Sequence, residues 1–548
     1  MSDLESVIAA YRSGLLSRSA FVRRLLTLGL GMAFIESLLG APVKHVLAAS
    51  NQTQMPARTP RLVLVVMDAF RFDYQSLAPM PNLARLMQRG STFTNAWVGQ
   101  LESVTPASHA TISTGATPAR QGIMGFSWRD AATKQEVYGG WYDEVLAGRL
   151  EQQLRSHDVT SIPQAVKSHD PTARVVALSS EKYYAADAMG GPAADYIFFG
   201  MPKGAAITPV GIPHHVPPPA FLANKALHRK WPLKYGQFDE LAMTMALESL
   251  RAFDPRVLMI NLPGCDTYGH STGGPTRPDV MSKLVTGVDQ QLGRLIKAYK
   301  DRGVLDETIF VVTGDHGMVP NTYQVQDTTI KDTIRAAGGD YLFHTGGSAA
   351  FIWLRNPEAA PAVAQRLVDT LPHARVAHYQ TLQTGAYLHH AVAPTGQTVD
   401  PALEAAHQYL LATCAGPLAP DITLTLVENM VVRNRLQGSA TAPHGNHSGP
   451  TWGVQHIPLV IAGPGVKAGG VLDFPARLMD IAPTALTLMG IEPSRMDGIQ
   501  LSDALIHPTS DAQRATDDVI ARMTAYQRAI SDRSAADVQD QKAAASSP

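Results

Sequence analysis

Acidic and imidazole side chains follow apolar stretches at several points of this sequence, most clearly at Asp315 and His316. The β-branched and aromatic run at residues 309–313 predicts a buried strand, which leads through Gly314 into this pair. Open α/β sheets place their chemistry outside the carboxyl ends of their strands. A carboxylate beside an imidazole at such an end is a suitable ligand pair for a divalent metal ion. The structural alternative is that Asp315 caps a turn and His316 packs beside it.

Further segments repeat this arrangement, and the repetition favours metal binding. Residues 62–67 predict a buried strand that ends at Asp68. Residues 257–262 predict another strand, followed by Asp266 and His270 in a glycine-rich loop. The two side chains are four residues apart, close enough to bind one ion.

A late histidine supplies a third candidate imidazole. His447 lies shortly before the predicted core strand at residues 457–461. His444 is the alternative ligand in the same stretch, whereas His456 is better explained as a packing or outer residue.

Thr105 and Lys182 are the candidate residues for contact with a substrate. Thr105 precedes Pro106 and a helix-compatible run, so it is expected at the N-cap with proline at the first helical position. The same position suits catalysis, because a hydroxyl at a helix N-terminus faces free N–H donors that would hold a phosphoryl group. Lys182 follows a predicted strand at residues 173–178 and either reaches this edge or is a solvated surface charge.

Composition limits the classes of function. The 548 residues carry 45% hydrophobic side chains, enough for a large core, and a formal net charge of -1, which gives no electrostatic case for binding nucleic acid. Two cysteines, Cys265 and Cys414, cannot form a disulfide framework.

The first 50 residues have the order of an export signal. A basic region at residues 17–24 precedes an apolar stretch at residues 25–35, and small residues cluster at residues 47–50. The basic region is twin-arginine-like, with Ser19 where the second arginine is expected. The apolar stretch is too short to span a membrane comfortably, so we expect no stable membrane span in the mature protein. We expect the protein to be exported, either to the periplasm or by secretion. An uncleaved amphipathic helix on a cytoplasmic enzyme is the alternative.

The remaining sequence divides by its pattern. Strands and helices alternate over residues 51–325 and 426–508, as in an α/β catalytic domain. Residues 326–425 break this alternation and predict an inserted α+β lobe, expected to act as a lid or specificity lobe. Residues 509–548 are charged and alanine-rich and predict a C-terminal tail.

Five motifs occur in order along the chain, each beside a predicted strand. They are Asp68, Thr105 before the His-Ala-Thr-Ile-Ser-Thr-Gly run at residues 109–115, the Asp266–His270 pair, the run at residues 315–317, and His447. Together they resemble the type I phosphodiesterase/nucleotide pyrophosphatase branch of the alkaline phosphatase superfamily, over roughly residues 60–325 and 430–505. The resemblance implies a three-layer sandwich with a mostly parallel central sheet and a smaller inserted α+β lobe.

The resemblance also implies a two-zinc site and a phosphoric ester as the small-molecule substrate. One zinc ion would bind Asp266, His270 and His447. The other would bind Asp68, Asp315 and His316, with Thr105 as nucleophile at its open position. Two such ions can hold the attacking and leaving oxygens of an in-line displacement, through a phosphothreonine intermediate. The pattern makes no prediction of oligomeric state.

Two departures from the family bear on the substrate. Phe126 stands where these enzymes usually carry an asparagine that contacts a phosphoryl oxygen. Lys182 is kept from the Lys-x-Arg pair of the monoesterase branch, but Tyr184 replaces the arginine. These changes leave open diesters, pyrophosphates, monoesters and phosphonates or other esters, and a non-catalytic binding protein that retains the fold. A phosphomutase lacks its usual serine nucleophile here, and a sulfatase lacks its modified cysteine or serine.

Overall fold

A central sheet carries the residues singled out above. The computed structural model describes residues 59–433 and 444–546, so the predicted export segment lies outside the described residues. In spatial order the strands of the sheet are β21 (Gly470–Leu472), β2 (Gly90–Phe93), β20 (Leu459–Ala462), β10 (Thr308–Gly314), β1 (Arg61–Met67), β9 (Val257–Leu262), β5 (Val175–Ser179), β6 (Tyr196–Lys203), β7 (Ala206–Gly211) and β8 (Arg229–Lys230). The central strands β10, β1, β9, β5 and β6 are parallel, and antiparallel pairings occur toward both edges. A mostly parallel sheet is therefore confirmed.

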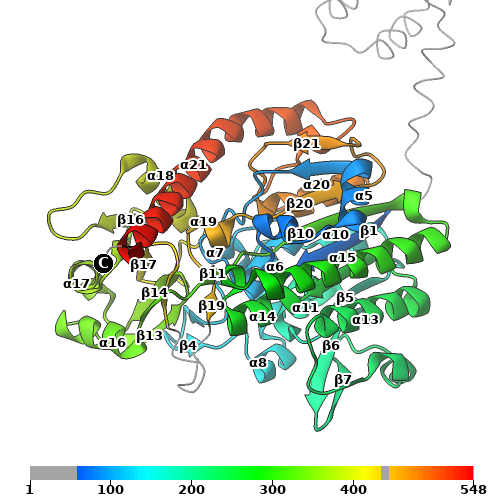
Figure 1. Ribbon diagram of the computed structural model, residues 1–548, viewed down its shortest axis with the longest axis horizontal. Coiled ribbons are helices and arrows are strands. Elements are labelled where there is room, and N and C mark those ends of the chain that lie inside the picture. The colour runs from blue at the N-terminus through cyan, green and yellow to red at the C-terminus, as the bar shows by residue number, and fades with distance from the viewer. Residues whose placement is uncertain (1–58, 434–443, 547–548) are drawn as a thin grey trace, which may run out of the picture. The chain divides into compact units, whose positions relative to one another are not determined.

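Helices cover both faces of this sheet, as Figure 1 shows. Alternate residues of β1 enter two different cores, with Leu64 in one and Val65 in the other. Such a strand must be apolar on both sides, which explains its continuous hydrophobic run. One face packs against α6 (Thr105–Thr114), α10 (Ile162–His169), α11 (Tyr183–Gly190) and α20 (Ile481–Leu488), and the other against α5 (Pro81–Arg89), α13 (Gln237–Phe253) and α15 (Pro278–Asp301). The three-layer sandwich is thus confirmed.

A second, antiparallel sheet lies where the sequence predicts an inserted lobe. Its strands, in spatial order, are β13 (Tyr341–Gly346), β14 (Ala349–Leu354), β17 (Ile422–Leu426), β15 (Ala374–Gln383) and β16 (Ala386–Val392). The helices of this region are α16 (Asp327–Ala336), α17 (Ala360–Thr370) and α18 (Pro401–Ala412). The first two share a separate core with the sheet, built around Ile330, Ile352 and Val363. The boundaries of the lobe stay a prediction.

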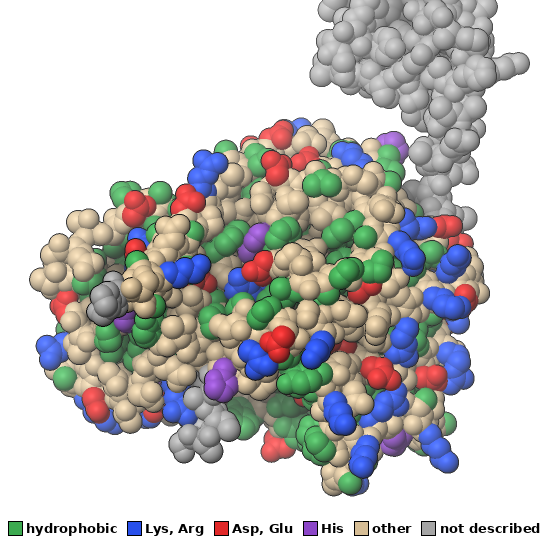
Figure 2. Space-filling model, viewed as in Figure 1, with side chains coloured by type: hydrophobic (Ala, Val, Ile, Leu, Met, Phe, Trp, Pro, Cys, Tyr) green, Lys and Arg blue, Asp and Glu red, His purple; other side chains and the backbone are tan. Residues whose placement is uncertain are grey.

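The C-terminal segment forms one long helix. Helix α21 (Ser510–Ser546) has 37 residues and runs alongside α18, as the red ribbon in Figure 1 shows. It buries Met523 and Ile530 in the core that α6 and α11 share. Among the described residues, no helix is both long and apolar enough to span a membrane. On the face drawn in Figure 2, Lys and Arg side chains lie among Asp and Glu, in keeping with the formal net charge of -1.

One segment predicted as a loop is regular structure. The glycine-rich stretch after β9 is a helix, α14 (Gly264–Thr272), although glycine usually weakens helices. Gly264 is explained by close approach, since a Cβ there would lie 2.4 Å from a carboxylate oxygen of Asp239. The Asp239 carboxylate accepts the backbone N–H of Gly264 at 2.8 Å and fixes the start of the helix.

Candidate metal centre and active site

Adjacent parallel strands bring the predicted ligands to one edge of the sheet. Met67 of β1 is paired with Gly314 of β10 and with Leu262 of β9. Asp68 and Asp315 therefore leave the sheet side by side, while α14 carries Asp266 and His270 from the end of β9. His447 follows β19 (Gly445–Asn446), and Lys182 lies between β5 and α11. All six predicted ligands, together with Thr105 and Lys182, meet at this edge.

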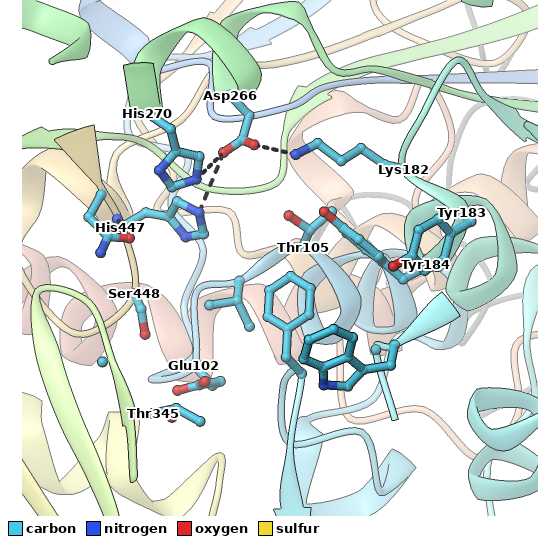
Figure 3. A pocket seen from close by; sticks show the side chains of 16 residues that line it. Glu102, Thr105, Lys182, Tyr183, Tyr184, Asp266, His270, Thr345, His447 and Ser448 are labelled. Carbon is cyan, nitrogen blue, oxygen red and sulfur yellow. Dashed lines mark hydrogen bonds and ion pairs between the residues drawn. The ribbon is translucent and has the colours of Figure 1, made fainter. Parts of the chain in front are cut away.

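Asp266, His270 and His447 form the first group. The Nε2 atoms of His270 and His447 lie 3.3 and 3.4 Å from Oδ1 of Asp266. Asp266 and His270 are on the same face of α14, because residues four apart in a helix project in the same direction. Figure 3 shows both imidazole rings turned toward this carboxylate. The three side chains are placed to share one cation.

Asp68, Asp315 and His316 form the second group. Nε2 of His316 lies 3.3 Å from Oδ2 of Asp315 and 3.7 Å from Oδ1 of Asp68. All three side chains are fully buried. Asp68 also shares a cluster with Asp266 and His316, and another with Asp315 and His109, so it lies between the two groups.

The three imidazoles present the same nitrogen to the centre of the site. Each Nδ1–H donates to a backbone carbonyl: His270 to Gly445 at 2.8 Å, His316 to Gly317 at 2.9 Å and His447 to Ser103 at 3.2 Å. A carbonyl oxygen only accepts, so the proton of each neutral ring is on Nδ1 and the Nε2 lone pair is free. This arrangement is typical of metal-binding histidines.

Buried carboxylate oxygens provide the test of whether cations fit. Among the described side chains, Asp68 Oδ1, Asp266 Oδ1 and Asp315 Oδ2 are buried without a hydrogen-bond donor, and all three face the imidazole Nε2 atoms. An ionised carboxylate in such surroundings is strongly disfavoured unless a positive charge compensates it. The donor set of three carboxylates and three imidazoles suits divalent transition metals such as zinc.

Burial and mutual repulsion shift the acidity of these groups. Burial, and then the charge of Asp315, raise the pKa of Asp68 well above its usual value. Burial lowers the pKa of both His316 and His447 to about 4, which keeps the rings neutral. Burial also acts to raise the pKa of Asp266, but the Lys182 ammonium outweighs it and the pKa falls well below its usual range.

Thr105 faces the second group of ligands. Helix α6 begins at Thr105 itself, and its N-cap is Val104, so the threonine makes no side-chain cap. Its hydroxyl lies 3.3 Å from Nε2 of His316 and is buried. The capping role expected from the sequence is therefore wrong. The hydroxyl points to the same centre as the ligands, at the positive end of a helix.

Other residues support the site without belonging to the predicted set. Asn261, on β9, donates from Nδ2 to Oδ2 of Asp68 at 2.9 Å and accepts the Ser179 hydroxyl at its Oδ1, 2.8 Å away. The same amide lies 3.0 Å from Nε2 of His109, whose Nδ1–H donates to the Thr105 carbonyl at 2.8 Å. A polar residue inside the apolar run of β9 was the signal that could have revealed Asn261. The alternative ligand His444 is exposed.

A cavity of about 300 Å³ opens beside these residues. Its polar floor contains Thr105, Lys182 and Asp266, and Phe126, Trp141, Tyr183 and Tyr184 form aromatic walls. Figure 3 shows Tyr183 and Tyr184 on one side of Thr105, and His447 and Ser448 on the other. The Phe126 and Tyr184 rings meet edge to face, 4.9 Å between centroids. A phosphoryl group on the floor would thus leave its ester substituent against aromatic rings.

This sheet, with its metal-binding groups and a threonine at one edge, has the alkaline-phosphatase-like fold. The chain belongs to the type I phosphodiesterase/nucleotide pyrophosphatase family, whose sequence model matches residues 62–450.

Individual relatives agree with this assignment. The alkaline phosphatase PhoK of Sphingomonas sp is 25% identical over 316 residues, which cover 48% of this chain and 56% of the enzyme. The chain thus spans little more than half of that relative. One similar structure is murine ectonucleotide pyrophosphatase/phosphodiesterase 5, an inactive variant in complex with AMP, with a TM-score of 0.55 and 16% sequence identity. The match covers 81% of this chain and 100% of the murine chain. Alkaline phosphatase PafA has a TM-score of 0.61 and 16% identity, covering 82% and 100%. These structures support the fold.

Proposed function

We propose that this protein hydrolyses phosphoric esters at a two-zinc centre, through a covalent phosphothreonine on Thr105. The observation that carries the proposal is the convergence of three unpaired carboxylate oxygens and three imidazole Nε2 atoms beside a buried threonine hydroxyl. One ion would be held by Asp266, His270 and His447, and the other by Asp68, Asp315 and His316. Bound there, the ions would supply Lewis acidity and neutralise charge on the phosphoryl oxygens.

The residues of the chain divide the remaining tasks. Oγ1 of Thr105 attacks phosphorus, its proton is lost to solvent, and the alcohol or phosphate leaving group departs from the opposite side. Water then cleaves the phosphothreonine, releasing phosphate or a phosphate monoester and restoring the hydroxyl. The free N–H groups at the start of α6 and the Lys182 ammonium stabilise the equatorial oxygens, where most of the charge lies.

The aromatic walls favour an ester with a bulky, apolar or planar substituent. Burial raises the pKa of the Tyr184 phenol, so this group remains a neutral donor at the position where the monoesterase branch carries an arginine. Phe126, at the position of the family's asparagine, offers no hydrogen bond at all. A phosphodiester carries one negative charge fewer than a monoester dianion and needs fewer donors. We therefore infer a preference for aryl or nucleoside diesters.

The test compares Thr105→Ala and Thr105→Ser with the parent enzyme on bis(p-nitrophenyl) phosphate, alongside zinc analysis. We expect the alanine variant to lose at least about 1,000-fold in kcat while keeping its zinc, because Thr105 supplies the nucleophile. The serine variant should keep measurable turnover. Acid-quenched parent enzyme should yield a peptide with one p-nitrophenylphosphoryl group on Thr105. Full activity in the alanine variant would disprove the nucleophile, and a metal-free protein that hydrolyses no ester or phosphonate would instead indicate a binding protein.

We also propose that the protein is exported, on the order of basic, apolar and small residues within its first 50 positions. Fractionation of cells that express the full chain should recover it outside the cytoplasm and shortened at its N-terminus. Full-length protein confined to the cytoplasm would contradict this.

A further inference from the structure

A second cluster of metal-binding side chains lies between the smaller sheet and α18, outside the cavity described above. His378 is on β15, and Glu404 and His407 are on α18. One potential ligand atom from each of the three lies within 4.8 Å of the other two. Glu404 and His407 are three residues apart and so project from the same face of the helix.

The contacts of this cluster resemble a set of ligands around a centre. Nε2 of His378 lies 2.9 Å from Oε2 of Glu404. The His378 and His407 rings are perpendicular, with centroids 5.6 Å apart. The other carboxylate oxygen of Glu404 accepts the Gln408 amide at 2.6 Å, which fixes the orientation of the group. Asp400 caps the helix by accepting the N–H groups of residues 402 and 403.

The second observation is a buried imidazole nitrogen to which no described residue is hydrogen-bonded. His407 is only 4% exposed, and within the described ranges its Nδ1 is buried without a hydrogen-bond partner, as is Nδ1 of His378. A buried nitrogen without a partner costs on the order of 1–3 kcal/mol, so a simple His–Glu pair does not account for the cluster. A cation bound between the rings and the carboxylate would take up lone pairs that are otherwise unused.

A fourth histidine lies on the same side of the hairpin. His378 of β15 pairs with Ala391 of β16, so the alternating side chains place His389 on the face of the sheet that carries His378. His389 is half-buried and lies beside α18, where its backbone carbonyl accepts the Gln408 side-chain amide at 3.1 Å. Its neighbour His390 points the other way, where it contacts Thr381 Oγ1 at 2.8 Å.

One neighbouring charge acts against a cation at this cluster. It is Arg375, on the same strand as His378, and its guanidinium is paired with Asp537 of α21. The four candidate ligands are three imidazoles and one carboxylate, a set that favours zinc over calcium or magnesium. A site closed by four protein ligands is structural, since it leaves no open position for a substrate.

We propose that His378, Glu404 and His407, with His389 as the fourth ligand, form a structural zinc site that fastens the β15–β16 hairpin to α18. This site is independent of the catalytic centre. Zinc bound there would stabilise the folded smaller sheet and the surface on which α21 lies.

The test measures zinc in the full-length protein after dialysis. In a His270→Gln/His447→Gln background, which weakens the first catalytic ligand group, His378→Gln/His407→Gln should remove about one zinc ion per chain. The same pair should remove the same amount from the otherwise unchanged protein. His390→Gln, a histidine on the same hairpin that faces away, is the matched control and should leave zinc content unchanged. Equal zinc content with and without His378 and His407 overturns the proposal. The zinc lost on replacing His378 and His407 is compared in both backgrounds. The result therefore does not depend on whether the catalytic centre binds zinc.

Stability supplies a second measurement that does not depend on the stoichiometry. Zinc added to chelator-treated protein should raise the Tm of the His270→Gln/His447→Gln variant. This increase should be smaller when His378→Gln/His407→Gln is added, because only the Asp68, Asp315 and His316 group then remains intact. His389→Gln, at a half-buried position that disturbs the core little, should weaken zinc binding about tenfold or more. Cobalt in place of zinc should give the visible absorption of a tetrahedral site. Unchanged affinity in His389→Gln together with an unchanged Tm increase would also refute the site.

Discussion

The Lys182 ammonium nitrogen lies 2.6 Å from Oδ2 of Asp266, while Oδ1 of the same carboxylate faces His270 and His447. One oxygen of Asp266 is therefore occupied by a fixed charge and the other is left for a cation. Burial acts to lower the pKa of Lys182, but Asp266 outweighs it and holds the pKa well above its usual value, so the ammonium stays charged. Lys182 also lines the cavity beside Thr105. The Lys182 charge can therefore both orient the Asp266 carboxylate and interact with a phosphoryl oxygen of a substrate.

Replacing Lys182 should separate these roles. Lys182→Gln is expected to lower kcat/KM for bis(p-nitrophenyl) phosphate about 100-fold, because a charged donor to the transition state is lost. Zinc content should not fall, because the glutamine amide can still donate to Oδ2 of Asp266 and hold that carboxylate in place. Steady-state kinetics and metal analysis on the same sample check both statements. Lys203→Gln, at an exposed position on β6, is the control and should behave as the parent. A loss of zinc in Lys182→Gln would contradict the assignment.

Asn261 should affect zinc affinity through Asp68, which it orients without contacting the centre itself. Among the described residues, Asn261 supplies the only side-chain amide that donates to Oδ2 of Asp68, so after Asn261→Ala the carboxylate is free to turn. Outer partners of this kind typically contribute 10–100-fold to metal affinity, so we expect a loss in that range. Competition with a chelator of known affinity measures it.

A control for this variant must show that the effect is local. Asn224→Ala removes a side-chain amide that is hydrogen-bonded to Glu248. Neither residue is one of the proposed metal ligands, so zinc affinity should be unchanged. If Asn261→Ala binds zinc as tightly as the parent, the Asn261–Asp68 hydrogen bond has no functional weight.

The aromatic pair at Phe126 and Tyr184 should determine the ester class. Changing both to the residues found in the monoesterase branch, Phe126→Asn and Tyr184→Arg, adds one amide and one guanidinium where a dianionic phosphoryl group would lie. We expect kcat/KM for p-nitrophenyl phosphate to rise about tenfold relative to that for the diester. Assays of both substrates with each single variant and the double variant give the ratio. An unchanged ratio would show that these two positions do not select the substrate.

Much of the fold could be predicted because each central strand carries its own signal. The continuous apolar runs of β1, β9 and β10 have the composition of strands buried on both faces, and the acidic residues after them mark their carboxyl ends. The ligand set could be proposed from order alone. The division of these ligands between two ions depends on interatomic distances, which the spacing of residues in the sequence does not give. Asp68 is an example, because it lies close to side chains of both groups.

The errors arose where long-range contacts outweigh local preference. The sequence of α14 predicts a loop because Gly264 and Gly269 are poor helix formers. In the structure, Asp239 accepts a hydrogen bond from the first turn of α14, and Met318 packs so close to Gly269 that a Cβ there would not fit. The sequence predicts that Thr105 caps a helix, but its hydroxyl contacts the imidazole of His316 instead. The cluster around His378 and His407 had no signal in the sequence, since its members come from a strand and a helix of the inserted segment.

Asp239 should make the stability of the protein depend on pH. Burial raises its pKa from 3.8 to about 7, although the Gly264 N–H acts in the opposite direction. Between these two values the folded protein keeps the proton that the unfolded chain has released, so stability falls as pH rises through this window. Asp239→Asn stays neutral and still accepts from Gly264 through its amide oxygen. Relative to the parent, the variant should therefore gain stability from pH 4 to pH 8, by on the order of 4 kcal/mol at most.

Urea unfolding of both proteins in chelator, across this pH range, isolates the effect from metal binding. The quantity to compare is the difference in unfolding free energy between variant and parent at each pH, because other groups titrate in both. Asp473→Asn, at an exposed position, should give a difference that does not change with pH in this way. If the difference for Asp239→Asn is also flat, the carboxyl is ionised throughout. Helix α14 would then begin at a charged group, and the acceptor that holds Asp266 and His270 in place would be an anion.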